Sequence, residues 1–323
     1  MTEQAGDVEQ GILWRQEHLA PLPIPTGQPA SDLMNLIWRK NEVYLDIGSF
    51  PMGAGWLTLH CLTFILAIAS IWTAWSATSV ADAPWWVDFV IPAAGGGILI
   101  PLWYFYIKQW RKPLASPIRF NRQRREVCIT RPDGSYWFVP WERVHAIAPS
   151  VTNLGTYGAS KHGSLVLWFP LEGQENEPYS ESKEGWVLAV NPGGGISSMA
   201  QWECIRSFME VGPDAVPESS HTGRSEQVAQ HGYLGVWWML IVQLYDELKA
   251  REYGAAFSTL AGLTIFGMPW ITVLLTRKLA HIPDLTSPEA VEWSKPLPLD
   301  QWTKRSAELE QAIARREAEL RAQ

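Results

Sequence analysis

The stretch GWLTLHCLTFILAIASIWTAWSA, Gly55 to Ala77, carries no charged side chain over more than twenty residues. A helix of about 20 apolar residues is long enough to cross the ~30 Å hydrocarbon core of a membrane. A second apolar stretch, WWVDFVIPAAGGGILIPLWYFYI from Trp85 to Ile107, follows a short linker that contains Asp82 and Pro84. Together they predict a transmembrane helical hairpin over residues 54–107, with spans at about 55–77 and 85–107.

The lysine and arginine pattern predicts how this hairpin is oriented. Neither residue type occurs between the two stretches, whereas Arg39 and Lys40 precede the first, and Lys108, Arg111 and Lys112 follow the second. Because basic residues near spans stay on the cytoplasmic side, both ends of the hairpin should face the cytoplasm. The chain is therefore expected to be a multi-pass protein of a bacterial inner (cytoplasmic) membrane.

Residues 1–53 are expected to form an N-terminal cytoplasmic segment. It contains the proline-rich stretch APLPIPTGQPAS and then SDLMNLIWRKNEVYLDIG. Ser31 or Asp32 is a suitable N-cap for a short helix with Leu33, Leu36 and Ile37 on one face. Such a helix would pack against the membrane surface or against the folded domain.

Residues 117–212 predict a cytoplasmic β-domain. The runs 126–131 and 135–139 are joined through Pro132, Asp133 and Gly134, a combination typical of a hairpin turn. Two more runs, 164–169 and 185–190, are separated by the polar stretch LEGQENEPYSESKE, which is expected to be a solvated loop. Apolar residues at helical spacing then predict a closing helix over 198–210; they are Met199, Trp202, Ile205 and either Phe208 or Met209.

The C-terminal third is expected to be a further helical region. Residues 213–254 form a linker and an interfacial helix, because their apolar run is only about a dozen residues long. Residues 255–276 are a third candidate span, which Gly267 and Pro269 interrupt. Basic residues flank this window on both sides, so the side occupied by the C-terminus stays open. Residues 277–323 form a charged tail that contains a helix.

Composition excludes several classes of function. A net charge of −7 argues against nucleic acid as a partner. Three widely spaced cysteines and seven scattered histidines form no disulfide framework and no metal-ligand motif. The NPGGG loop satisfies neither the Walker nor the dinucleotide-binding pattern, and no nucleophile elbow occurs. We therefore expect no metal, no cofactor and no enzymatic activity.

The order of two membrane helices, a basic linker and then strands resembles bacterial membrane-anchored domains of pleckstrin-homology-like fold. The resemblance rests on FNRQRREV and on Pro140, Trp141 and Glu142, which open the next element. It implies a small β-barrel-like domain closed by a C-terminal helix, with these three residues in structural roles. The chain also looks like an uncharacterised family of Gram-negative bacteria whose members are encoded near type VI secretion genes. That likeness implies an immunity or accessory protein. The predicted fold class is thus an α+β membrane protein.

Four basic residues are the candidate binding residues for lipid or a protein partner: Arg119, Arg122, Arg124 and Arg125. Each basic residue near an anionic leaflet contributes about 1 kcal/mol of attraction. In the alternative interpretation they set the topology and solvate the first hairpin.

The leading hypothesis is a membrane-anchored binding protein whose partners are membrane lipids and a protein such as a secretion effector. A regulator that responds to anionic lipids is the second hypothesis. A small transporter or channel, assembled around Gly95 to Gly97 with Asp88 in its span, is the third.

Overall fold

The computed structural model describes residues 4–48, 52–78, 86–131, 133–155, 158–171, 173, 185–193 and 195–322. The chain is an α+β protein that divides into two compact units. Met1–Ser49, Ala115–Ser220 and Pro283–Gln323 form one, which we call the β unit. Phe50–Leu114 and His221–Ile282 form the other, the helical unit. The expected positions of Asp82, Pro84 and Pro132 and most of the 171–184 loop lie outside the described residues.

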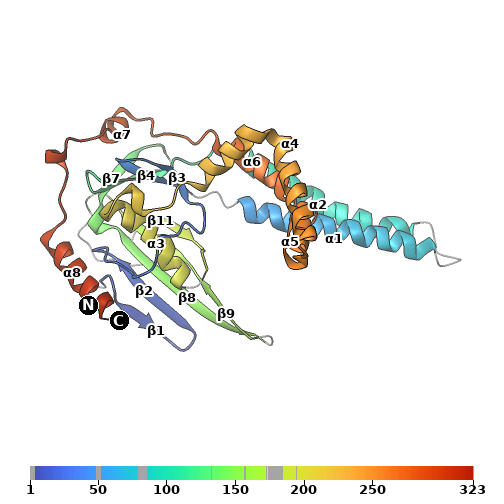
Figure 1. The fold of residues 1–323 in the computed structure, drawn as a ribbon, viewed down its shortest axis with the longest axis horizontal. Helices are drawn as coiled ribbons and strands as arrows, with labels where there is room; N and C mark the ends of the chain where they lie inside the picture. Colours follow the sequence, from blue (N-terminus) through green and yellow to red (C-terminus); the bar gives the residue numbers. More distant parts are fainter. Residues whose placement is uncertain are drawn as a thin grey trace. The chain divides into compact units, whose positions relative to one another are not determined.

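The strands of the β unit form two antiparallel sheets (Figure 1). One has the order β1-β2-β8-β10-β11, with β9 paired to β8, and the other has the order β3-β4-β5-β6-β7. The strand bounds are β1 Val8–Gln10, β2 Trp14–Ala20, β3 Ile37–Lys40, β4 Tyr44–Ile47, β5 Ile118–Asn121, β6 Glu126–Thr130, β7 Tyr136–Pro140, β8 His145–Gly155, β9 Gly158–Gly163, β10 Leu165–Pro170 and β11 Gly185–Val190.

The N-terminal segment differs from its prediction, because it supplies four strands to the two sheets. Asp32 does accept hydrogen bonds from backbone N–H groups, those of Leu36 at 2.8 Å and Ile37 at 3.0 Å. These bonds close a turn instead of starting a helix, and Ile37 begins β3. Residues 1–49 are therefore part of the β unit and not a separate segment.

The predicted β6–β7 hairpin and the strands near 164–169 and 185–190 are present, and the last two pair directly as β10 and β11. The expected barrel is not closed: the described strands form two sheets, with β3 and β7 at the edges of one of them. Pro140 ends β7, and a 3-10 helix, η1 (Trp141–Arg143), leads the chain into the other sheet. Proline has no N–H to continue a strand ladder, which accounts for the separation at this point.

Helix α3 (Gly195–Glu210) closes the β unit and contacts β2 and β8 of one sheet, β10 of the same sheet, and β5 of the other (Figure 1). Its side chains Trp202, Ile205 and Phe208 are fully buried in a core with Phe120 and Trp141. The helix thus joins the two sheets through one apolar core.

The C-terminal segment 283–323 belongs to the β unit, although the chain reaches it only after the helical unit. Its elements are α7 (Pro288–Trp293), η3 (Leu299–Gln301) and α8 (Ala307–Arg321), and η2 (Pro213–Ala215) follows α3 in the same unit. Trp293 packs on Phe138 of β7, with ring centroids 5.0 Å apart, and closes a small apolar cluster with Cys128, Leu285 and Ala290. The charged tail is thus a packed part of the fold.

The helical unit contains α1 (Met52–Thr78), α2 (Val87–Trp110), α4 (Ser220–Lys249), α5 (Tyr253–Leu263) and α6 (Met268–Leu279). Among the described residues, α1 is the one helix that is long and apolar enough to cross a membrane by itself, over Gly55–Ser76. Helices α5 and α6 meet the same criterion only as a pair, and they are bent by 59° at the break between them.

The docking of Trp293 leads to a prediction about Cys128, a buried thiol whose pKa burial raises to about 12. Replacing Trp293 by Ala removes a side chain that covers this thiol. We expect maleimide labelling of Cys128 to become faster than in the wild type, measured by mass spectrometry. Leu299→Ala, at a side chain that is 80% exposed, is the matched control and should leave the rate unchanged.

Candidate functional site

The four predicted arginines lie on and beside the β5–β6 hairpin, but their side chains make different contacts. Arg119 is buried, at 2% exposure, and Arg125 is buried at 7%. Arg122 and Arg124 are partly buried. The hairpin turn places Arg125 in the left-handed region, at φ 53°. The four residues therefore do not form one continuous exposed cationic patch.

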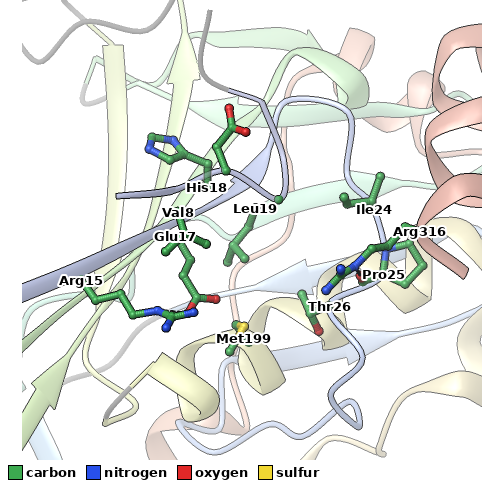
Figure 2. A pocket seen from close by; sticks show the side chains of 12 residues that line it. Val8, Arg15, Glu17, His18, Leu19, Ile24, Pro25, Thr26, Met199 and Arg316 are labelled. Atoms are coloured by element: carbon green, nitrogen blue, oxygen red, sulfur yellow. Dashed lines mark hydrogen bonds and ion pairs between the residues drawn. The ribbon is translucent and has the colours of Figure 1, made fainter. Parts of the chain in front are cut away.

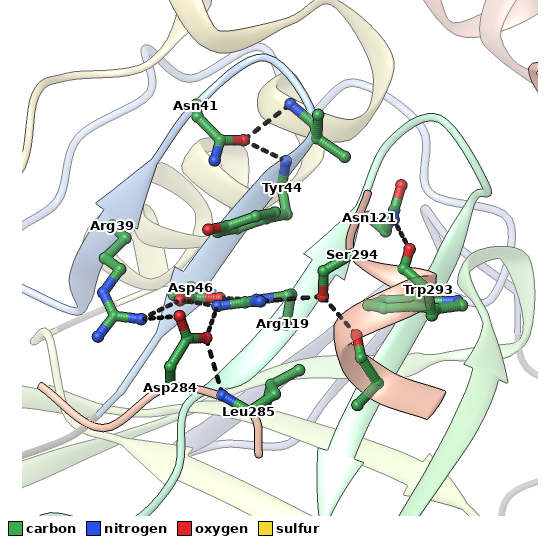
Figure 3. A network of polar contacts seen from close by, with 12 residues as sticks. Arg39, Asn41, Tyr44, Asp46, Arg119, Asn121, Asp284, Leu285, Trp293 and Ser294 are labelled. Atoms are coloured by element: carbon green, nitrogen blue, oxygen red, sulfur yellow. Dashed lines mark hydrogen bonds and ion pairs between the residues drawn. The ribbon is translucent and has the colours of Figure 1, made fainter. Parts of the chain in front are cut away.

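Arg119 is the centre of a polar network shown in Figure 3. Its Nε and Nη2 donate to the two carboxylate oxygens of Asp46, at 2.6 and 2.7 Å. Nη2 also donates to Asp284 at 2.7 Å, and Nη1 donates to Ser294 at 2.9 Å. The guanidinium carbon lies 3.7 Å from the ring centroid of Tyr44, within cation–π range. We call these five residues, together with Arg39, the Arg119 network.

Arg39 adds a second cation to the network. Its Nη1 lies 3.5 Å from Asp46 and 3.4 Å from Asp284, so two arginines share two carboxylates. Burial alone lowers the pKa of Arg119, but the hydrogen bonds and the charge of Asp46 outweigh it and raise the pKa above its usual value. Burial alone raises the pKa of Asp284, but Arg119, a backbone N–H and Arg39 outweigh it and hold that pKa low.

Arg125 joins a second network with Glu210 at its centre. Arg125 donates to Glu210 at 2.8 and 3.2 Å and to Glu142 at 3.1 Å. Trp141 Nε1 donates to Glu210 at 2.7 Å, and Arg305 Nε donates to it at 2.6 Å. Burial alone raises the pKa of Glu210, but the arginines and the indole N–H lower it.

Pro140, Trp141 and Glu142, which were predicted to have structural roles, lie where β7 ends. Trp141 is fully buried and stacks on Trp202, with ring centroids 5.4 Å apart. Glu142 accepts hydrogen bonds from Arg125 and from the backbone N–H and hydroxyl of Ser306. Pro140 is exposed and precedes η1. Trp141 and Glu142 thus connect the first hairpin to α3 and to the C-terminal segment.

The remaining two arginines also contact the C-terminal segment. Arg124 Nε donates to the carbonyl of Trp293 at 2.9 Å. The Arg122 guanidinium lies 5.3 Å from the ring centroid of Trp302, and it donates to the carbonyl of Val211 at 3.2 Å. The arginine-rich hairpin is therefore the surface on which residues 283–306 pack.

Three members of the Arg119 network are close in sequence to the points at which the chain passes between the two units, at about residues 49, 114, 220 and 282. Asp46 lies just before the first passage, Arg119 just after the second, and Asp284 just after the fourth. At the third passage, Ser219 donates to the carbonyl of Ile37 at 2.8 Å. Lys40, on the same strand, forms a 2.7 Å ion pair with Glu218. Each passage is thus fixed within the β unit by a charged or hydrogen-bonded contact.

Sequence reasoning did not identify the acidic partners Asp46, Glu210 and Asp284. Asp46 is 73 residues from Arg119, and Asp284 is 165 residues from it. The sequence carries a weak signal for a buried carboxylate, because Asp46 lies between Leu45 and Ile47 in a short strand that contains no other charged residue.

A cavity of about 190 Å³ lies between β2, the 24–26 stretch, α3 and α8 (Figure 2). Arg15 and Glu17 line it from β2, where they form a 2.7 Å ion pair, and Arg316 lines it from α8. Thr26 and Met199 are also part of the wall. Cations, carboxylates and apolar groups are mixed, so the lining selects no single class of ligand by charge. Within the described ranges, no group of three His, Cys, Asp or Glu side chains could hold a metal ion.

A comparison of the chain with protein-family models, with curated proteins and with solved structures found no match.

The Arg119 network predicts a large loss of stability when Arg119 is replaced by Ala. Asp46, which is fully buried, would lose its bidentate partner, and breaking a buried pair in this way costs about 3–5 kcal/mol. We expect a lower melting temperature for the full chain in detergent, followed by near-ultraviolet circular dichroism. Arg315→Ala is the control: this residue pairs with Glu319 on the surface, and such a pair is worth about 0.3–0.5 kcal/mol. Equal losses in the two variants would contradict the assignment.

Glu210 predicts a pH dependence. Because its pKa is lowered in the folded state, its ionised form stabilises the fold above the unfolded pKa of about 4.3. This contribution is lost as the pH falls through the folded pKa. We expect Glu210→Gln to be less stable than the wild type at pH 7, with a difference in urea midpoint that narrows below about pH 4. The exposed Glu308→Gln is the control, and a constant difference for Glu210→Gln would contradict the role.

Proposed function

We propose that the chain is a membrane-anchored binding protein: the helical unit holds it in a bilayer, and the β unit binds a protein partner. The observation that carries the proposal is α1. Its membrane-length stretch Gly55–Ser76 is apolar, yet only 6% of it is buried by the rest of the chain. The core helix of a soluble protein would be mostly covered, so this helix fits a lipid environment.

The exposed side chains of α1 and α2 are of the kind that lipid would cover. Ile71 is 70% exposed and Trp72 62% exposed on α1, and Ile100 is 71% exposed on α2. Aliphatic surface of this extent is unfavourable in water by roughly 25 cal/mol per Å². Tryptophan is favoured near the membrane–water interface, which fits the aromatic rings at the helix ends.

The position of the helices in the chain supports their predicted orientation. The α1–α2 hairpin is inserted between β4 and β5, which are paired strands with Ile47 opposite Ile118. Both ends of the hairpin are therefore attached to the same sheet, and both belong on the same side of a membrane. This agrees with the basic residues that flank the hairpin, which favour the cytoplasm.

The β unit presents an apolar tip that suits a protein partner. The turn between β1 and β2 is closed by the Gly11 N–H bonded to the Trp14 carbonyl at 2.8 Å, and Ile12 within it is 100% exposed. Leu13, Trp14 and the cross-strand neighbour Val151 are also exposed. The exposed Trp14 is a suitable anchor for a partner, because tryptophan is enriched in interaction hot spots.

Two of the predicted arginines favour protein binding over lipid regulation. Arg119 and Arg125 direct their donors at carboxylates within the β unit, which leaves fewer cationic groups for headgroups. A pleckstrin-homology-like origin of the domain fits two sheets joined by α3, and immunity or accessory function in type VI secretion is the specific form of the proposal. Gly95 packs against Leu66 within the hairpin, so a channel built on these glycines has no support of its own.

The test is affinity purification of the tagged full-length chain from detergent-solubilised, carbonate-washed membranes. We expect the chain to stay in the washed membranes and to retain a protein partner. Ile12→Asp should release that partner, whereas Leu299→Asp, also at an exposed leucine of the β unit, should not. A secreted toxin as the partner would support immunity. Release of the chain by carbonate, or recovery of lipid alone, would contradict the proposal.

A further inference from the structure

Helices α5 and α6 are a bent pair whose connection leaves backbone groups outside the helical ladder. Thr264 caps α5, and Gly267 begins α6 in the left-handed conformation, at φ 57° and ψ 36°. The 59° bend between the two helices is compatible with two interpretations: one broken span that crosses the bilayer, or a re-entrant pair that enters and leaves on the same side.

The length of each helix suits a re-entrant pair. Helix α5 has 11 residues and α6 has 12, so at 1.5 Å per residue they are about 16 and 18 Å long. A hydrocarbon core is about 30 Å thick. Each helix is therefore too short to cross it alone.

Side chains of α1 hold the connection at a defined depth. Trp56 Nε1 donates to the carbonyl of Phe266 at 3.1 Å, and His60 Nδ1 lies 3.0 Å from the carbonyl of Ile265. At 1.5 Å per residue, Trp56 and His60 lie about 6 and 12 Å along α1 from its first residue, Met52. The connection is thus held in the half of α1 that adjoins the β unit along the chain. Non-helical backbone at membrane depth is stable only when protein groups satisfy it, as these two side chains do.

The end of α6 returns to the level of the end of α2. Lys278 Nζ donates to the carbonyl of Trp110 at 2.9 Å and to that of Lys112. Helix α2 ends at Trp110, from which the chain runs to β5. Helix α6 therefore runs from the depth of His60 back to the side from which α1 starts.

Chain connectivity requires the same result. Residues up to Ser220 and from Pro283 belong to one compact unit, the β unit. With the proposed anchor, a folded unit lies on one side of the bilayer, so the chain between these residues must cross an even number of times. Helix α4 has a non-helical break at Gly232, and its remaining part, about 17 residues, is about 25 Å long and ends in charged residues. Helix α4 therefore does not cross the bilayer. Because the number of crossings must be even, α5 and α6 together do not make a single crossing either.

A re-entrant pair also explains why basic residues occur at both ends of α5–α6, a pattern that left the orientation open in the sequence analysis. Lys249 and Arg251 precede α5, and Arg277 and Lys278 end α6. A single span would place one of these groups on the side that basic residues avoid. A re-entrant pair keeps both groups on the favoured side.

We infer that α5 and α6 form a re-entrant helical pair that contacts the acyl chains of one leaflet, the leaflet in which α1 starts and α2 ends. Its lipid-facing surface consists of exposed side chains of both helices, Phe257, Leu260 and Trp270. The inference rests on the proposed membrane anchor, and its test separates the two.

The experiment is single-cysteine labelling of the full chain in spheroplasts and in inverted membrane vesicles, with a membrane-impermeant maleimide. Cys61→Ala provides the background, because Cys128 and Cys204 are buried and burial raises the pKa of both thiols. Reporter cysteines are introduced at Glu252 before α5, at His281 after α6, at Glu310 in the β unit and at Asp82 between α1 and α2.

We expect the cysteines at positions 252, 281 and 310 to react in the inverted vesicles and the one at 82 to react in the spheroplasts. Reaction of 252 and 281 from opposite sides would overturn the re-entrant pair and leave the anchor intact. Reaction of 82 and 310 from the same side would overturn the anchor, and the pair with it.

A second variant tests the contact with α1. A Cβ at Gly267 would lie 2.5 Å from His60 Nε2 in a backbone conformation that favours glycine, so Gly267→Ala should displace the connection. A cysteine at Thr264 should be protected from the maleimide in the parent chain and labelled in Gly267→Ala. Gly262→Ala, whose Cβ would meet only Met268 Cγ at 3.5 Å, is the matched control. Persistent protection in Gly267→Ala would contradict the contact.

Discussion

The buried ion pair between Arg119 and Asp46 is the interaction on which the arrangement of this chain depends. It joins adjacent strands of one sheet, yet the strands are separated in sequence by the whole α1–α2 hairpin. Two charges removed from water need each other and need further hydrogen bonds, which Asp284 and Ser294 supply. All hydrogen-bonding groups of the pair therefore find partners only when three parts of the chain that are distant in sequence come together.

This requirement explains how the β unit is assembled from three pieces of chain that the helical unit interrupts twice. The apolar core supplies much of the driving force, through Phe120, Trp141 and Trp202. The charged networks determine which chain segments lie next to each other, because a carboxylate and a guanidinium with bidentate geometry accept few alternative partners.

Under the proposed membrane anchor, the same interruption limits the topology of the chain. A folded unit would occupy one side of a bilayer, so every segment that leaves the β unit would have to return to that side. This constraint turns an ambiguous pattern, basic residues on both sides of an apolar window, into a statement about topology. The contacts of Trp56 and His60 with the carbonyls of Phe266 and Ile265 agree with it, although they are a separate observation.

The amino-acid sequence by itself determined the local elements with strong periodicity or strong turn signals. Three elements were predicted in this way: the apolar stretch from Gly55, the β6–β7 hairpin around Asp133 and Gly134, and the closing helix with Trp202 and Phe208. They depend on interactions between near neighbours in the sequence, or on the exclusion of apolar side chains from water, which acts on each apolar residue in the same way. Only the tertiary structure decided that the N-terminal segment joins both sheets, that the arginine-rich hairpin binds the C-terminal segment, and that the described strands form two sheets and not a closed barrel. The physical reason is the distance in sequence between the residues that interact. Hydrophobic periodicity is read within a dozen residues, whereas the partner of a buried charge is set by which strands pair, and Arg119 finds its carboxylates 73 and 165 residues away.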